Sequence, residues 1–269
     1  MSPIFLHIGP LTIYWYSILI LTAFVLGYFM VTHEMKKESM PLEFLSNYFF
    51  YLVPIVILGA RVYYVIFEWQ YYSHHLTEIF AVWNGGLAIH GGILAGLIFT
   101  VFYTKKEKVN TLKLFDVIAP YLIIGQAIGR WGNFFNQEAH GPETTLSFLQ
   151  SLHLPDFIIE GMHFSDFGNY TYWHPTFLYE SLGCLLGFIL ILVIRSRKKT
   201  KIGMQSAIYF IVYGITRFFI EALRQDSLMF LGLKVAQLVS IVMVLSGVIL
   251  MIYSIKKCDY YHGKENKHE

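Results

Sequence analysis

Seven long apolar segments dominate this chain of 269 residues, in which 55% of the residues are hydrophobic and only 14% are charged. A helix of about 20 apolar residues crosses the hydrocarbon core of a bilayer, and such a composition excludes an ordinary soluble domain. We therefore predict an all-α integral membrane fold with seven transmembrane helices, forming a single polytopic domain over residues 1–269. The predicted helices lie near 13–32, 44–66, 86–103, 114–135, 176–195, 203–223 and 234–255.

Basic residues follow alternate apolar segments, which predicts the orientation of the chain. They occur at Lys36 and Lys37, at Lys105, Lys106, Lys108 and Lys113, at Arg195, Arg197, Lys198, Lys199 and Lys201, and at Lys256, Lys257, Lys264 and Lys267. Residues 67–85 and 136–175 contain neither lysine nor arginine. Because cytoplasmic loops carry the excess of basic residues, we expect an external N-terminus, a cytoplasmic C-terminus and a small external cap at 136–175.

The remaining composition removes several classes of function. Cys184 and Cys258 have no metal-ligand spacing, and the chain contains no H-E-x-x-H or G-x-S-x-G motif. We therefore expect no metal and no organic cofactor. The net charge of +2 reflects mainly the orientation signal, so it gives no argument for a nucleic-acid partner. Residues 1–11 lack the basic region and cleavage site of a removable signal peptide, so we expect the first helix to be retained.

Three arginines lie inside the apolar segments: Arg61, Arg130 and Arg217. An arginine at the bilayer centre costs roughly 2.5–3.5 kcal/mol even on the lowest scale. We therefore expect each of them to face a polar cavity or an anionic group.

Arg130 belongs to a glycine-rich block at the end of its apolar segment. On a helix, Arg130, Asn133 and Gln137 share one face, and Asn136 and Glu138 lie beside them in the sequence. A guanidinium grips a phosphate with two parallel hydrogen bonds, and an asparagine amide adds a further donor. The block is therefore a candidate phosphate site. The alternative is a polar plug that only hydrogen-bonds neighbouring helices.

A second polar stripe ends the segment at 203–223. Tyr213, Arg217, Glu221 and Arg224 follow one another at spacings of 4, 4 and 3 residues, which places them on one side of a helix. Two arginines against one carboxylate leave a positive excess that an anionic ligand would balance. The alternative is an Arg–Glu–Arg ladder that merely makes burial tolerable.

His90 lies among five glycines between positions 85 and 96. A histidine exchanges protons near neutral pH, although a lone buried histidine more often only makes hydrogen bonds. Farther along, Pro175 suits the first turn of a helix, and we interpret Glu180 as part of that structural helix start. Tyr16 near the first apolar segment is also typical of an interfacial aromatic belt.

These blocks resemble a known family, the bacterial prolipoprotein diacylglyceryl transferases. The stretch from Gly129 to Gly141 matches the family signature G-R-x-G-N-F-x-N-x-E-x-x-G at every specified position. The segments GGLAIHGG, HPTFLYE and RFFIEALR are similar to further family blocks in the same order. The resemblance implies seven helices with an external N-terminus in the bacterial cell membrane, and an active site toward the outer leaflet.

The resemblance also implies an activity and roles for the residues above. The diacylglyceryl group of phosphatidylglycerol would pass to the lipobox cysteine of a prolipoprotein signal peptide, forming a thioether and releasing glycerol phosphate. Arg130 and Arg217 would clamp the phosphate, and His90 would take the thiol proton. The other expected contacts with phosphatidylglycerol come from Tyr16, Asn133, Asn136, Glu138, Tyr213, Glu221 and Arg224, with Glu221 holding the two arginines beside it.

Two other classes remain open from the residues alone. The same arginines could form the selectivity site of a transporter or channel for an anionic solute or lipid, or they could be buried ion pairs of a scaffold. Transport would produce flux and survive the loss of His90, whereas a transferase modifies a peptide without any gradient.

Overall fold

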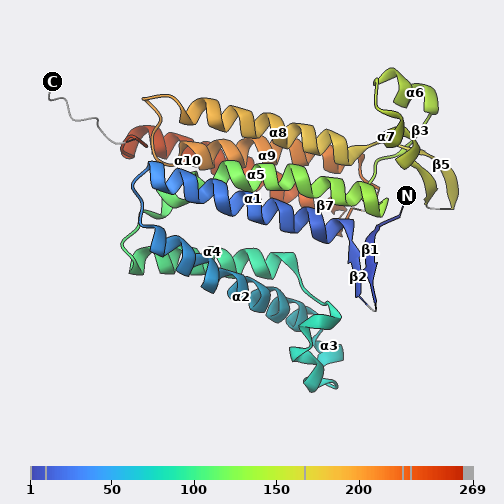
Figure 1. Ribbon diagram of the computed structural model, residues 1–269, viewed down its shortest axis with the longest axis horizontal. Helices are drawn as coiled ribbons and strands as arrows, with labels where there is room; N and C mark the ends of the chain where they lie inside the picture. The colour runs from blue at the N-terminus through green and yellow to red at the C-terminus, as the bar shows by residue number, and fades with distance from the viewer. Residues whose placement is uncertain (1, 10, 167, 226, 231, 263–269) are drawn as a thin grey trace. The chain divides into compact units, whose positions relative to one another are not determined.

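The computed structural model describes residues 2–9, 11–166, 168–225, 227–230 and 232–262. Seven helices of 18 residues or more run through the described part of the chain (Figure 1). They are α1 (Trp15–Lys37), α2 (Leu42–Phe67), α4 (Ile89–Lys106), α5 (Thr111–Asn136), α8 (Thr176–Arg195), α9 (Met204–Leu223) and α10 (Val235–Lys257). Each overlaps one of the predicted apolar segments.

The long helices differ in how well they suit a bilayer. Within the described residues, six of them are long and apolar enough to cross a membrane, and α4 is the exception. Helix α4 has 18 residues, carries His90 and two glycines in its first turn, and ends in two lysines. Large apolar side chains such as Phe29 and Ile249 are about two-thirds exposed, at 66% and 68%, and extensive apolar surface of this kind marks contact with lipid. The count of seven spans stays a prediction.

The chain divides into two compact units. The first combines residues 1–31 with residues 115–269, and the second is Thr32–Leu114. The expectation of a single domain over the whole chain stays a prediction.

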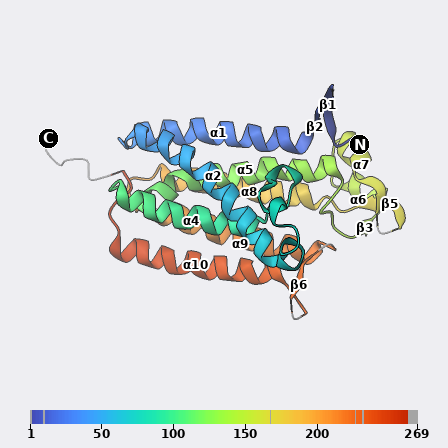
Figure 2. The ribbon, with the colours of Figure 1, turned by 90° about the horizontal axis from the view of Figure 1, so that it is seen from below.

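In the first unit, α9 packs against α8 and α10, and α5 and α1 run alongside (Figure 2). One buried cluster joins α5, α8 and α9 and consists of Ala119, Ile123, Ala127, Cys184, Ile191, Ile208 and Tyr209. Helix α8 runs antiparallel to α5 and α9 (Figure 1). Its first turns therefore meet the last turns of these two helices at one end of the bundle. Arg130, Glu180, Arg217 and Glu221 lie together at that end.

The segment at 136–175, predicted as a cap, folds between α5 and α8. It contains α6 (Leu146–Ser151), α7 (Asp156–Gly161) and an antiparallel sheet in which β5 (Asn169–Trp173) lies between β3 (Glu143–Thr144) and β4 (His163–Asp166). Its buried core is Phe134, Leu149, Ile158, Ile159, Met162, Phe164, Trp173 and Phe177. Since Phe134 belongs to α5 and Phe177 to α8, this core anchors the cap to the bundle.

Two short hairpins complete the first unit. The strands β1 (Ile4–Ile8) and β2 (Leu11–Tyr14) pair just before α1, and β6 (Met229–Phe230) and β7 (Leu233–Lys234) pair between α9 and α10. The strands of the described residues thus all lie outside the long helices.

In the second unit, α2 packs against α4 at close range. A Cβ atom on Gly91 would lie only 2.3 Å from the carbonyl oxygen of Gly59, so the approach requires glycine at this point. The connection between the two helices contains α3 (Trp69–Tyr72) and the 3-10 turns η1 (Leu76–Phe80) and η2 (Val82–Asn84). It leads directly to His90, the second residue of α4.

Candidate functional site

A chain of ion pairs links α5, α8 and α9 at the end of the bundle that carries the cap. Nη2 of Arg130 lies 2.9 Å from Oε1 of Glu180, and Nη1 of Arg217 lies 3.2 Å from Oε2 of the same carboxylate. Nη2 of Arg217 lies 2.6 Å from Oε2 of Glu221, one helical turn away. Glu180 therefore bridges the two arginines that the sequence singled out.

The two kinds of charge in this cluster are not equally accessible. The side chains of Glu180 and Glu221 are only 2% and 3% exposed, whereas those of Arg130 and Arg217 are 21% and 15% exposed. The ion pairs use only part of the five N–H donors that each guanidinium carries. The accessible part of the cluster is therefore cationic, and the buried carboxylates hold both guanidinium groups in place.

Tyr213 and Arg224 complete the α9 side of the cluster. Tyr213 and Arg224 both lie near the guanidinium of Arg130. Arg224 itself lies just beyond the end of α9. There Nζ of Lys234 lies 2.7 Å from the carbonyl oxygens of both Glu221 and Arg224, so this lysine closes the C-terminus of the helix.

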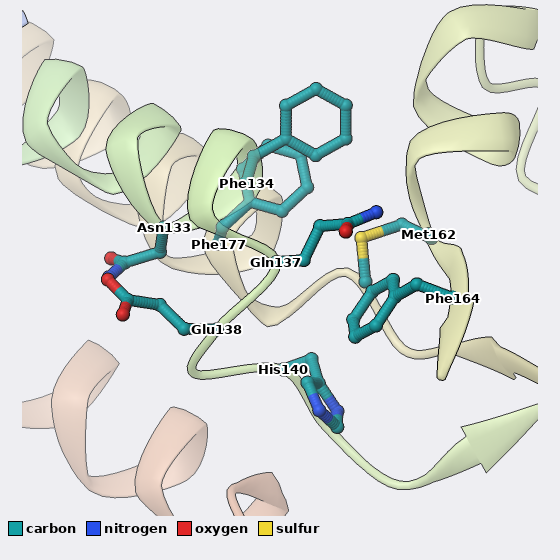
Figure 3. A pocket seen from close by; sticks show the side chains of 8 residues that line it. All are labelled: Asn133, Phe134, Gln137, Glu138, His140, Met162, Phe164 and Phe177. Carbon is teal, nitrogen blue, oxygen red and sulfur yellow. The ribbon is translucent and has the colours of Figure 1, made fainter. Parts of the chain in front are cut away.

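The signature residues form a second hydrogen-bonded group next to Arg130. Nη1 of Arg130 donates to Oδ1 of Asn133 at 3.3 Å. Nδ2 of Asn133 and Nδ2 of Asn136 donate to Oε1 of Glu138 at 2.9 and 3.2 Å. The amide of Asn133 and the carboxylate of Glu138 are turned toward each other (Figure 3). Glu138 is therefore connected to Arg130 through a single asparagine.

Glu138 lies in a strained turn. The residues on either side of it, Gln137 and Ala139, have φ angles of 54° and 57°, and this left-handed region costs a non-glycine residue roughly 1–2 kcal/mol. Oγ1 of Thr176 donates to the carbonyl oxygen of Ala139 at 2.6 Å, and Nε2 of Gln137 donates to Gly161 of the cap at 3.4 Å. The cap and the start of α8 thus hold the turn that presents Glu138.

A shallow pocket lies beside this turn (Figure 3). Its lining combines polar and aromatic side chains: Asn133, Phe134, Gln137, Glu138, His140, Met162, Phe164 and Phe177. Nδ1 of His140 lies 2.8 Å from the carbonyl oxygen of Gly141, and Nε2 lies 2.7 Å from Oδ2 of Asp166. Both ring nitrogens of His140 are therefore engaged, and the histidine ties the turn to β4.

Two glycines of the signature are required by close contacts. A Cβ atom on Gly132 would lie 2.3 Å from Cδ2 of Tyr16, and one on Gly141 would lie 2.8 Å from Cβ of His174. The ring of Tyr16, which is 41% exposed, therefore lies directly against the backbone of α5. This contact places Tyr16 of α1 beside the signature residues of α5, and its expected role in lipid binding stays a prediction.

His90 and Arg61 belong to the second unit. The side chain of His90 is exposed, and its ring centroid lies 6.2 Å from that of Tyr63; its role as a base stays a prediction. Arg61 was expected to face a polar cavity or an anionic group. It donates instead to four backbone carbonyl groups, because hydrogen bonds to carbonyl dipoles also compensate a buried guanidinium.

Glu180 is the residue of this site that the sequence analysis did not include. The sequence pattern indicated only a helix start there, because its partners Arg130 and Arg217 belong to other helices and lie far away in the sequence. A signal was nevertheless present: the segment at 176–194 contains one carboxylate and no basic residue. A charge alone in an apolar helix needs a partner on another helix.

The fold and the site define a multi-pass membrane protein with a partly accessible pair of arginines held by buried carboxylates. Residues 3–253 match the family model for prolipoprotein diacylglyceryl transferase. The chain is 47% identical over 250 residues to the phosphatidylglycerol–prolipoprotein diacylglyceryl transferase of Geobacillus kaustophilus, covering 93% of this chain and 91% of the relative. The enzymes of that name from Ligilactobacillus salivarius and Listeria monocytogenes serotype 4b are 44% and 43% identical, over 94% and 99% of this chain and 93% and 95% of their own. This chain therefore belongs to the prolipoprotein diacylglyceryl transferase family.

Proposed function

We propose that this protein transfers the diacylglyceryl group of phosphatidylglycerol to the lipobox cysteine of a prolipoprotein, the first step of lipoprotein maturation. Membership of the family and the names of its relatives supply the two substrates. The observation that carries the proposal is the accessible cationic edge of the Arg130–Glu180–Arg217 cluster. A lipid phosphodiester brings one negative charge, which two guanidinium groups bind through several N–H donors.

The reaction exchanges one bond for another at a glyceryl carbon. The thiolate sulfur attacks the carbon that carries the phosphate oxygen, a C–S bond forms, and the electron pair of the broken C–O bond leaves with the phosphate. The leaving group is glycerol phosphate, whose charge grows from one toward two as the bond breaks. Arg130 and Arg217 therefore stabilise the transition state more than the bound lipid.

The thiol must lose its proton for this attack. A free cysteine has a pKa near 8.5, so it is mostly protonated at neutral pH. We propose His90 as the base that accepts this proton. It lies among glycines at the start of α4, and its side chain is exposed. The reaction as written needs no metal and no organic cofactor.

The other residues bind and position the lipid. Glu180 and Glu221 hold the two arginines, and Asn133, Asn136 and Glu138 form a polar wall beside Arg130. Tyr16, Tyr213 and Arg224 complete the phosphatidylglycerol site.

We further propose seven membrane spans with the N-terminus outside and the C-terminus in the cytoplasm of a bacterial cell. The last turns of α1, α4 and α10 carry Lys36 and Lys37, Lys105 and Lys106, and Lys256 and Lys257. The cap contains no lysine or arginine. This asymmetry supports an orientation in which the arginine cluster lies toward the outer leaflet.

The test uses the purified protein in vesicles of phosphatidylglycerol with a synthetic lipobox peptide. The peptide is expected to gain the mass of one diacylglyceryl group without any gradient, and a peptide with serine in place of the cysteine is expected to stay unmodified. Phosphatidylethanolamine vesicles should support much less transfer, because their ammonium group is repelled by the arginines. An unmodified peptide together with lipid or anion flux would favour a transporter instead.

A further inference from the structure

Arg61 has an unusual set of partners. It lies in α2 and is only 5% exposed. Its Nε donates to the carbonyl oxygen of Ile79 at 2.8 Å, and its Nη2 donates to that of Glu78 at 2.5 Å. Its Nη1 donates to the carbonyl oxygens of Gly85 and Gly86 at 2.9 and 3.0 Å. All four acceptors belong to the connection between α2 and α4.

No carboxylate among the described residues is ion-paired with this guanidinium. Arg61 binds the carbonyl oxygen of Glu78, whereas Oε2 of that residue accepts a hydrogen bond from the hydroxyl of Tyr71 at 2.9 Å. The ring of Tyr72 lies under the guanidinium, with Cζ 5.1 Å from the ring centroid. Arg61 therefore does not balance an acidic group. Its planar guanidinium binds the backbone of the connection between α2 and α4.

The backbone that it holds leads directly to His90. Gly85 and Gly86 have φ angles of 83° and 66°, and a Cβ atom on Gly86 would lie 2.3 Å from Nη1 of Arg61. Two residues later, the N–H of Ala88 donates to the carbonyl oxygen of Ala60 at 3.0 Å. Arg61 therefore fixes the Gly85–Gly86 turn, and the neighbouring Ala60 fixes Ala88, the residue just before α4.

Resting on the proposed function, we propose that Arg61 is a positioning residue for His90. It fixes the Gly85–Gly86 turn against α2 and thereby sets the place of the imidazole at the start of α4. A lysine would supply the charge but could not hold four carbonyls in one plane. A small misplacement of a catalytic group lowers turnover much more than it lowers substrate binding.

A double-mutant cycle in the full-length protein tests the proposal. Arg61→Lys, His90→Gln and the double variant are compared with wild type in phosphatidylglycerol vesicles with the lipobox peptide. Arg61→Lys is expected to lower kcat about 10- to 100-fold while KM for the lipid stays within about twofold. In the His90→Gln background the same substitution is expected to have little further effect, because the group that it positions is absent.

Arg195→Lys is the matched control. Arg195 is also buried, at 4% exposure, and its Nη2 donates to the carbonyl oxygens of Asp116 and Val117 at 2.7 and 3.3 Å, but it belongs to the first unit. Its effect on kcat should be the same in both backgrounds. If Arg61→Lys does not yield folded protein, Gly86→Ala replaces it, since the added methyl group displaces the same contact.

The outcomes separate this inference from the proposed function. Equal losses from Arg61→Lys in the wild-type and His90→Gln backgrounds would show that Arg61 acts on something other than His90. A wild-type protein that leaves the lipobox peptide unmodified would instead overturn the proposed function itself.

Discussion

Nη2 of Arg130, near the end of α5, lies 2.9 Å from Oε1 of Glu180, in the second turn of α8. The other oxygen of that carboxylate faces Arg217 of α9. One buried acid therefore sets the positions of two cations that come from different helices. In the proposed reaction the pair of arginines is therefore in place before the lipid phosphate binds, and preorganisation of this kind makes electrostatic stabilisation of a leaving group effective.

Glu180→Gln is expected to destabilise the fold as well as to lower activity. The amide keeps the size of the side chain but leaves two partly buried guanidinium groups short of one negative charge, and breaking a buried pair in this way costs up to about 3–5 kcal/mol. Thermal unfolding in detergent micelles measures the effect. Glu143→Gln is the control, because that carboxylate is exposed and its described partner is Nδ2 of Asn169. Equal unfolding temperatures for the two variants would contradict the bridging role.

Arg130→Lys and Arg217→Lys are each expected to lower turnover about 100-fold while the protein still inserts and accumulates. A lysine keeps the positive charge opposite Glu180 and Glu221, so the ion pairs survive, but it loses the planar fork that grips a phosphate. Initial rates of peptide modification measure the loss. Arg197→Lys, in an exposed loop, is the control and should behave as wild type. Near-normal rates in both site variants would remove the clamp from the mechanism.

Ala139→Gly is expected to stabilise the protein by about 0.5–1 kcal/mol. The φ angle of Ala139 is 57°, which glycine adopts without strain, although glycine also makes the unfolded chain more flexible. The measurement is the unfolding temperature in micelles. Ala236→Gly, inside α10, should have the opposite effect because its backbone is helical. A lower unfolding temperature for Ala139→Gly would mean that the turn stores no strain.

The positions of the long helices could be predicted from the sequence because runs of apolar residues mark them directly. The ends of the helices and the interior of the cap could be predicted less well from the sequence. The cap depends on contacts such as His140 with Asp166, which are 26 residues apart. No periodic pattern encodes a contact of that kind.

Within the candidate site, the same distinction holds. Arg217 and Glu221 could be predicted to face each other because they lie on one helix, four residues apart. The bridge through Glu180 depends on how three helices pack. The hydrogen bonds from Arg61 to four carbonyl oxygens depend on how the long connection between α2 and α4 folds. Sequence periodicity indicates which residues share a face of one helix, but it does not indicate which residues of a neighbouring helix contact that face.

The last prediction concerns pH and tests His90 as the base. His90→Gln is expected to depress turnover strongly near pH 6.5, and the ratio of the wild-type rate to the variant rate should fall as the pH rises to about 9. The reason is that the substrate thiol has a pKa near 8.5, so the thiolate then forms without help. Rates are measured with lipid and peptide both saturating. His74→Gln, an exposed histidine of the same unit, should give a ratio near one at every pH. If the ratio for His90→Gln is instead constant across this range, His90 does not take the proton, and Glu138, the exposed carboxylate hydrogen-bonded to Asn133 and Asn136, becomes the next group to test.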